Sequence, residues 1–186
     1  LSNAATLLLL IAPLVTMRLI AEERRNESLP LLLSAPLSTH QIVLGKYLGT
    51  FSFFLVLLFL ISLMPLSLSL GSQLDFGLLA SGLLGLALLL ASFTAIGLFL
   101  SSLTKQPTIA AMTTFACLFL LWIIDWVGNT QITAESSSLF SWLSLLRHYQ
   151  SLLQGEINSS DIIYYLIIIS TFLILTIRRL DSERLN

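Results

Sequence analysis

The stretch FGLLASGLLGLALLLASFTAIGLFLSSL, residues 76–103, contains no charged side chain. A helix that crosses a bilayer needs about 20 consecutive apolar residues, and this stretch exceeds that length. Four further stretches have the same apolar character: residues 1–20, 42–70, 107–127 and 162–177. We therefore expect an all-α fold, a polytopic membrane helical bundle in which five spans are present.

The composition points to a membrane protein with no sizeable soluble domain. Of the 186 residues, 56% are hydrophobic and 10% are charged, and the mean hydropathy is +0.92. Soluble domains carry about 25% charged residues, so a soluble domain of this size could not cover its surface. The single cysteine, Cys117, lies in an apolar run and cannot form an internal disulfide.

Lys and Arg are distributed unevenly between the two sides of the expected bundle. Eight of the nine flank the first connection, lie in the third or follow the last span: Arg18, Arg24, Arg25, Lys46, Lys105, Arg178, Arg179 and Arg184. Only Arg147 falls on the other side. Because Lys and Arg favour cytoplasmic loops, we expect a cytoplasmic C-terminus. A complete subunit would more naturally begin inside, so we expect a sixth helix before Leu1.

Local signals mark several helix borders. Ser38 and Gln41 have the spacing of a capping box, which predicts a helix start near residue 39. Pro107 suits a first helical position, because its missing N–H costs nothing there. Pro65 lies within an apolar run and is expected to kink or end the second span.

Small residues recur at spacing four in the third span, at Ala87, Ala91 and Ala95. Ser81 with Gly85, and Gly97 with Ser101, repeat this spacing. Such residues let helix backbones approach closely in lipid. Two interpretations stay open, packing within one subunit and a contact between subunits.

Residues 21–38 interrupt the apolar pattern between the first two spans. Five charges fall within six residues, at Glu22, Glu23, Arg24, Arg25 and Glu27. They precede a short Leu-rich stretch that two prolines divide. This is typical of an interfacial element with a charged head and a lipid-facing apolar side, although a solvated loop would show the same charges.

Three stretches follow a known pattern in their order and spacing. They read MRLIAEERRNESLPLLLSAPLSTHQIVLGKYLG at 17–49, IGLFLSSLTKQPTIAAMTTFACLFLLW at 96–122 and LSLLRHYQSLLQGEINSSDIIYYL at 143–166. Together they resemble the permease subunits of type-2 ATP-binding-cassette (ABC) transporters, six-span exporters of the gliding-motility and multidrug-like group. The family run reads E-E-R-x-x-G-T-L-E-L-L-L-x-x-P-V-S, followed by I-V-x-G-K.

The resemblance implies that residues 21–38 form a cytoplasmic coupling segment, which docks in a groove of a separate ATPase. Glu22, Glu23, Arg24 and Arg25 match the family run. The chain departs from it at Glu27 and Ser28, where the family has Gly-Thr, and at Pro30, where it often has Glu. Reversing the charges at Glu23 and Arg24 is expected to uncouple ATP hydrolysis from transport.

Other chemistries lack their motifs. Gly45 and Lys46 are followed by Tyr47 and have no glycine five residues before Gly45, so they form no phosphate-binding loop. The sequence has no His-Glu-x-x-His motif and no Gly-x-Ser-x-Gly elbow. His40 and His148 fall on opposite sides of the expected membrane, so we expect no metal site. No span carries a charge near its middle, which argues against proton coupling.

The only sizeable external segment lies between residues 129 and 160. Apolar residues recur over 139–155 with helical spacing, and Gly155 is expected to end this amphipathic helix on the outer leaflet. Arg147 and His148 could then meet lipid phosphate or substrate. The resemblance implies a short external gate helix here, with Arg147, His148 and Trp142 as gate candidates.

These observations predict the membrane-spanning permease subunit of an ABC exporter in the cytoplasmic (inner) membrane of a bacterium. The chain itself would be no enzyme and carry no cofactor, with Mg-ATP on the partner. The expected partners are two ABC ATPase subunits, a second permease copy as homodimer or heterodimer, and membrane lipids, but no nucleic acid. Two alternatives stay open: an ABC-like complex that does mechanical or regulatory work on an envelope partner, and a structural membrane-assembly protein without an ATPase.

Overall fold

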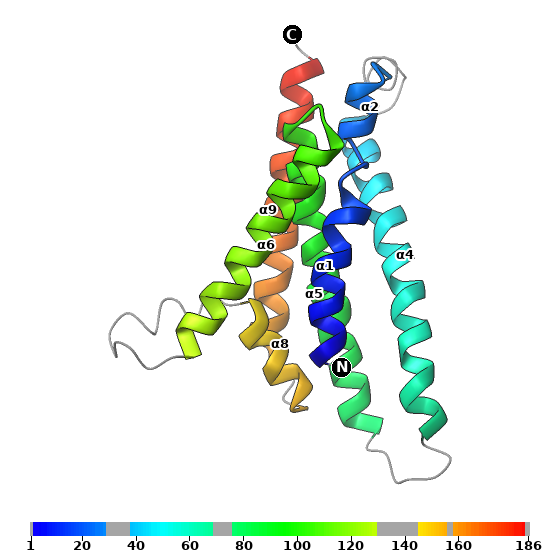
Figure 1. Cartoon of the computed structure of the whole chain (residues 1–186), viewed down its shortest axis with the longest axis vertical. Helices are drawn as coiled ribbons and strands as arrows, with labels where there is room; N and C mark the ends of the chain where they lie inside the picture. The colour runs from blue at the N-terminus through cyan, green and yellow to red at the C-terminus, as the bar shows by residue number, and fades with distance from the viewer. Residues whose placement is uncertain (1, 29–37, 69–75, 130–144, 156–157, 185–186) are drawn as a thin grey trace.

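The computed structural model describes residues 2–28, 38–68, 76–129, 145–155 and 158–184, which are almost entirely helical (Figure 1). The helices are α1 (Ser2–Thr16), α2 (Ala21–Arg25), α4 (Thr39–Leu68), α5 (Phe76–Leu103), α6 (Pro107–Asn129), α8 (Leu145–Leu153) and α9 (Ser159–Arg184). None of these described ranges forms a strand. The expected all-α membrane bundle is confirmed.

Among the described residues, four helical segments are long and apolar enough to cross a membrane. They are α4, α5, α9 and the stretch Ala5–Arg25, which contains most of α1 and all of α2. The apolar part of α6 over Pro107–Ile123 is shorter, although the helix as a whole has 23 residues. Helix α6 therefore corresponds to the fourth of the five expected spans. Its described apolar part is shorter than the expected 107–127.

Helix α5 lies at the centre of the bundle (Figure 1). It contacts α1, α2, α4, α6, α8 and α9, and 67% of its apolar window is buried against 22% for α4 and for α9. The outer helices instead expose large apolar side chains, such as Leu7, Phe59 and Ile167. Exposed apolar side chains of this kind are costly in water but not in hydrocarbon, so these faces suit lipid.

The predicted capping box at the start of α4 is confirmed. The backbone N–H of Ser38 donates to Gln41 Oε1 at 3.1 Å, and the N–H of Gln41 donates to Ser38 Oγ at 3.4 Å. Helix α4 runs through Pro65 and continues to Leu68, so the alternative that Pro65 ends the helix is wrong. At the other end of the chain, α9 extends beyond the expected 162–177 on both sides.

The first expected span, residues 1–20, covers α1 and the turns that join it to α2. Helix α1 ends at Thr16, residues 17–20 form turns, and α2 restarts the helix at Ala21. Residues 29–37 of the expected coupling segment and residues 139–144 of the expected external segment, including Trp142, lie outside the described residues. The described helix of the expected external segment is α8. It ends at Leu153, and the chain then turns through Gly155, which has φ of 85°, as expected of a glycine that closes a helix.

The small residues of α5 pack against other helices of the same chain. A Cβ added at Gly97 would lie 2.6 Å from Thr16 Cβ on α1, and one added at Gly85 would lie 2.9 Å from Leu152 Cβ on α8. The hydroxyl of Tyr47 on α4 donates to the carbonyl of Ala91 at 3.3 Å. At these positions the small side chains allow close packing within one subunit.

We predict that Gly97→Ala destabilises the protein by about 1–3 kcal/mol, the usual cost of overpacking a tight contact. The clash involves Thr16 Cβ, which cannot move without the α1 backbone. The matched control is Gly49→Ala on α4, where an added Cβ meets nothing within 4 Å. Thermal unfolding of both variants in detergent would check this, and equal midpoints would contradict it.

Candidate functional site

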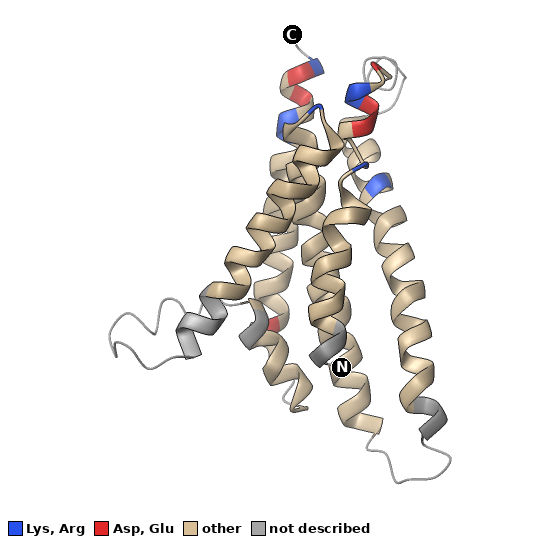
Figure 2. Cartoon of the chain, viewed as in Figure 1, with Lys and Arg blue, Asp and Glu red and all other residues tan. Residues whose placement is uncertain are grey.

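Charged side chains gather at one end of the bundle, where α2 and the end of α9 lie (Figure 2). The coupling residues expected from the sequence all belong to α2 or to the turn that follows it. The structure shows which of these charges face neighbouring helices and which remain exposed.

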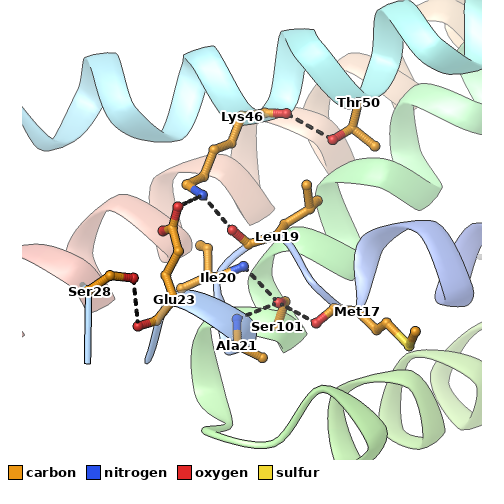
Figure 3. Close-up of polar contacts among 9 residues, drawn as sticks. All are labelled: Met17, Leu19, Ile20, Ala21, Glu23, Ser28, Lys46, Thr50 and Ser101. Carbon is orange, nitrogen blue, oxygen red and sulfur yellow. Dashed lines mark hydrogen bonds and ion pairs between the residues drawn. The ribbon is translucent and has the colours of Figure 1, made fainter. Parts of the chain in front are cut away.

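The break between α1 and α2 is held by Ser101, which lies on α5 (Figure 3). Its Oγ accepts hydrogen bonds from the backbone N–H groups of Ile20 and Ala21, each at 3.1 Å, and donates to the carbonyl of Met17 at 3.1 Å. Ile20 is the N-cap of α2 and provides no side-chain cap of its own. Ser101 therefore supplies, from a distant helix, the cap that buried helix starts require.

Glu23 links α2 to α4 through Lys46. The Lys46 Nζ lies 2.6 Å from Glu23 Oε1 and also donates to the carbonyl of Leu19 at 2.5 Å (Figure 3). The other Glu23 oxygen, Oε2, is buried and has no hydrogen-bond partner in the described part of the chain. One ammonium group thus binds both the turn at residue 19 and the first turn of α2.

Arg24 links α2 to α9, 159 residues further along the chain. Its Nη2 lies 2.6 Å from both Oε1 and Oε2 of Glu183, and the Arg24 side chain is only 10% exposed. Arg179 approaches the same carboxylate from one turn earlier on α9, at 3.4 Å. Because charge-assisted hydrogen bonds gain strength when partly shielded from water, this pair is the firmest side-chain link between α2 and α9.

The remaining charges of α2 face outward. Glu22 is 46% exposed on its side chain and lies 4.0 Å from the exposed Arg18, a pair that contributes little to stability. Arg25 and Glu27 are exposed, and neither forms an ion pair with any described residue. Two of the five expected coupling residues, Glu23 and Arg24, thus hold the bundle together, and three are available to a partner.

Helix α2 ends in a Schellman motif. The Ser28 N–H donates to the carbonyl of Glu23 at 3.0 Å, and the Glu27 N–H donates to that of Arg24 at 3.4 Å. This turn needs a residue in the left-handed region, and Glu27 has φ of 56°. Glycine adopts this conformation without the steric cost of a Cβ. The family run has Gly at this position because the turn requires a left-handed backbone. Glu27 adopts that backbone despite the steric cost of its Cβ.

A cavity of about 530 Å³ lies between α2 and the start of α6. Its lining consists of Arg24, Arg25, Glu27, Lys105, Gln106, Pro107 and Thr108. A smaller pocket of about 210 Å³ shares Arg25, Pro107 and Thr108 with it. The sequence predicts only that Lys105 lies on the cytoplasmic side. Its proximity to α2 depends on how α5 packs against the other helices, which the sequence does not show.

The expected external helix, α8, packs against α5, α6 and α9. Tyr149 and Leu152 of α8 are buried and contact the position of Gly85 on α5. His148 does not face outward, because its Nδ1 lies 2.6 Å from Asp161 Oδ1 on α9 and its ring stacks near Tyr164. Arg147 precedes it on α8, and the gate role of these residues stays a prediction.

In the described ranges, no group of three or more His, Cys, Asp and Glu side chains could hold a metal ion. The Asp161 carboxylate is buried beside His148, with its Oδ2 lacking a hydrogen-bond partner among the residues described. The hydroxyl of Tyr165 donates to the carbonyl of Leu145 at 2.7 Å. Together these contacts attach α8 to the first turns of α9.

We predict that Glu27→Gly stabilises the protein by about 1–2 kcal/mol, the cost of a left-handed residue with a Cβ. Glu27→Ala retains a Cβ and removes the same carboxylate, so it is the matched control and is expected to give no such gain. Unfolding of both variants in mixed micelles would measure the difference. Equal stability of the two variants would rule out backbone strain at this position.

The Arg24–Glu183 pair is expected to show a coupling energy of about 1.5–3 kcal/mol, typical of hydrogen bonds to charged groups. A double-mutant cycle of Arg24→Gln and Glu183→Gln would measure it as the failure of the two stability changes to add. Arg178→Gln is the control, because Arg178 is exposed at the same end and should stay within about 0.5 kcal/mol of the unchanged protein. Additive changes would contradict the link.

Comparison with known proteins agrees with this architecture. The family described as ABC-2 family transporter protein matches residues 3–184. No curated protein and no solved structure matches the chain significantly. The family match covers almost all of α1 to α9, including the charged end and the packed α8. The chain belongs to the ABC-2 family of transporter proteins.

Proposed function

We propose that this chain is the permease subunit of an ABC exporter, in which α2 and the segment after it dock on a separate ATPase. Family membership supports a membrane subunit of an ABC transporter. The uneven distribution of Lys and Arg supports a cytoplasmic side for α2, the end of α5 and the C-terminus. The proposed location is the inner membrane of a bacterium. ATP with Mg²⁺ binds the partner chain, where the hydrolysis takes place.

One observation carries this proposal: the short α2 is linked to three long helices at once. Ser101 joins it to α5, Lys46 joins it to α4, and Glu183 joins it to α9. A force applied to α2 therefore reaches most of the bundle through hydrogen bonds and ion pairs rather than through a flexible loop. Closure of the ATPase would move α2, and α2 would change the tilt of these helices.

The outward charges of α2 form the surface that meets the ATPase. Arg25 and Glu27 are exposed and the Glu22 side chain is 46% exposed, while Glu23 and Arg24 are engaged inside the bundle. Reversing Glu23 and Arg24 would damage the fold and the coupling together, so that change cannot separate the two. The exposed carboxylates of Glu22 and Glu27 provide a cleaner test.

The assembly contains two ATPase subunits and a second permease copy. Cargo passes along the interface between two copies rather than through one. The described spans carry Ser and Thr hydroxyls bonded to their own helix backbone, as at Ser92 and Thr94, and present no charge near their middle. This favours bulky or amphipathic cargo and energy delivered by the ATPase.

The double variant Glu22→Gln/Glu27→Gln is expected to bind the ATPase about two- to thirtyfold more weakly, since exposed charge pairs contribute about 0.2–1 kcal/mol each. Arg25 is left unchanged, so the variant removes only negative charges from α2 and the turn after it. The measurement is the yield of the nucleotide-binding chain that co-purifies from native membranes, with its ATP hydrolysis rate in liposomes. Arg178→Gln, on the same end of the bundle, is the control.

The outcomes separate the candidate functions. Unchanged ATPase binding by a folded Glu22→Gln/Glu27→Gln variant would overturn α2 as the docking surface. Failure of any nucleotide-binding chain to co-purify with the unchanged protein would leave a structural assembly role. An ATPase that binds but shows no substrate-stimulated hydrolysis would favour mechanical work on an envelope partner.

A further inference from the structure

We propose that the cavity between α2 and the start of α6 binds the phosphate group of an anionic phospholipid. The cavity opens at the charged end of the bundle and measures about 530 Å³, within the range of small-ligand sites. The proposal concerns the permease and its membrane alone, so it holds or fails independently of the ATPase.

Two of the three cations that line this cavity have no ion-pair partner among the described residues. Arg24 is paired with Glu183, but neither Arg25 nor Lys105 forms an ion pair in the part of the chain that is described. Glu27 is the single carboxylate of the lining. The two unpaired cations outnumber it, so the cavity attracts an anion.

The start of α6 adds to this positive potential. Pro107 and Thr108 line the cavity at the first turn of a 23-residue helix. Pro107 has no N–H, but the N–H of Thr108 lies in the first turn, where such groups lack partners within the helix and the helix dipole favours an anion. A tetrahedral phosphate can accept hydrogen bonds from backbone N–H, guanidinium and ammonium groups at the same time. The three donor types meet here.

The cavity also lies at the depth of lipid headgroups. Helix α5 has 28 residues and is therefore about 42 Å long, enough to cross the hydrocarbon core and both headgroup layers. The cavity lining begins two residues after α5 ends. A site at this depth is surrounded by lipid phosphates at high local concentration.

An exposed apolar stripe leads from the cavity along α6 and favours a lipid over a soluble anion or an acidic protein. Met112, Phe115 and Phe119 are exposed and share a helix face with Thr108, at spacings of four, seven and eleven residues. The rings of Phe115 and Phe119 stack at a centroid distance of 5.8 Å. An acyl chain attached to a phosphate in the cavity can lie along this stripe.

The test compares phosphatidylglycerol with zwitterionic phosphatidylcholine on the full chain, by native mass spectrometry of the detergent-purified protein. The unchanged chain is expected to bind phosphatidylglycerol more tightly. Lys105→Gln should weaken this preference about fivefold and Arg25→Gln/Lys105→Gln about 25-fold, at roughly fivefold for each cation near a membrane surface. Arg178→Gln should retain the full preference for phosphatidylglycerol. Lys105→Arg keeps the positive charge that Lys105→Gln removes, so it should also retain this preference.

Soluble glycerol 3-phosphate provides the second arm, because it carries the phosphate without the acyl chains. It should displace phosphatidylglycerol only at concentrations far above that of the lipid. Displacement at equal concentration would show that the cavity takes a soluble phosphate and would overturn the lipid assignment. An unchanged lipid preference in Arg25→Gln/Lys105→Gln would also overturn it, provided that thermal unfolding shows the variant to be folded. The same holds if this variant keeps its lipid preference and loses only its binding to the ATPase.

Discussion

Backbone hydrogen bonding at the break between α1 and α2 is the constraint on which the charged end depends. Hydrocarbon offers no water to unpaired N–H groups, so irregular backbone near a membrane must find partners within the protein. Ser101 is one hydroxyl that accepts from Ile20 and Ala21 and donates to Met17. Because this bond set fixes where α2 begins, it also fixes which of the α2 charges face inward.

The close approach of α1 to α5 makes the Ser101 contact possible. Gly97 lies one helical turn before Ser101, on the same face of α5. Its missing Cβ leaves room for Thr16, which bonds back to the carbonyl of Ala12 and ends α1. A bulkier side chain at 97 would push the end of α1 away from Ser101. The spacing of four thus combines a packing role with a capping role.

The amino-acid sequence alone predicts the features that depend on a local pattern of residues. Uninterrupted apolar length predicted the long helices, and the Ser38–Gln41 spacing predicted the start of α4. Pairings between distant positions could not be predicted, because Arg24 had several possible carboxylates and nothing local selects Glu183. The amphipathic pattern around Tyr149 and His148 was read as a lipid-facing helix. The same pattern also fits a helix packed on protein, and the periodicity does not distinguish the two surfaces.

The packing of α2 divides the mixed charges of the EERR run into an inner pair and an outer pair. Glu23 and Arg24 point into the bundle, where Lys46 and Glu183 neutralise one negative and one positive charge. The inner set is therefore electrically balanced and can be partly buried at modest cost. Two buried atoms of this set, Glu23 Oε2 and Arg24 Nε, have no hydrogen-bond partner among the described residues. They keep the cost above that of a fully satisfied network. In the proposed function, these links are the route by which a displacement of α2 would reach α4 and α9.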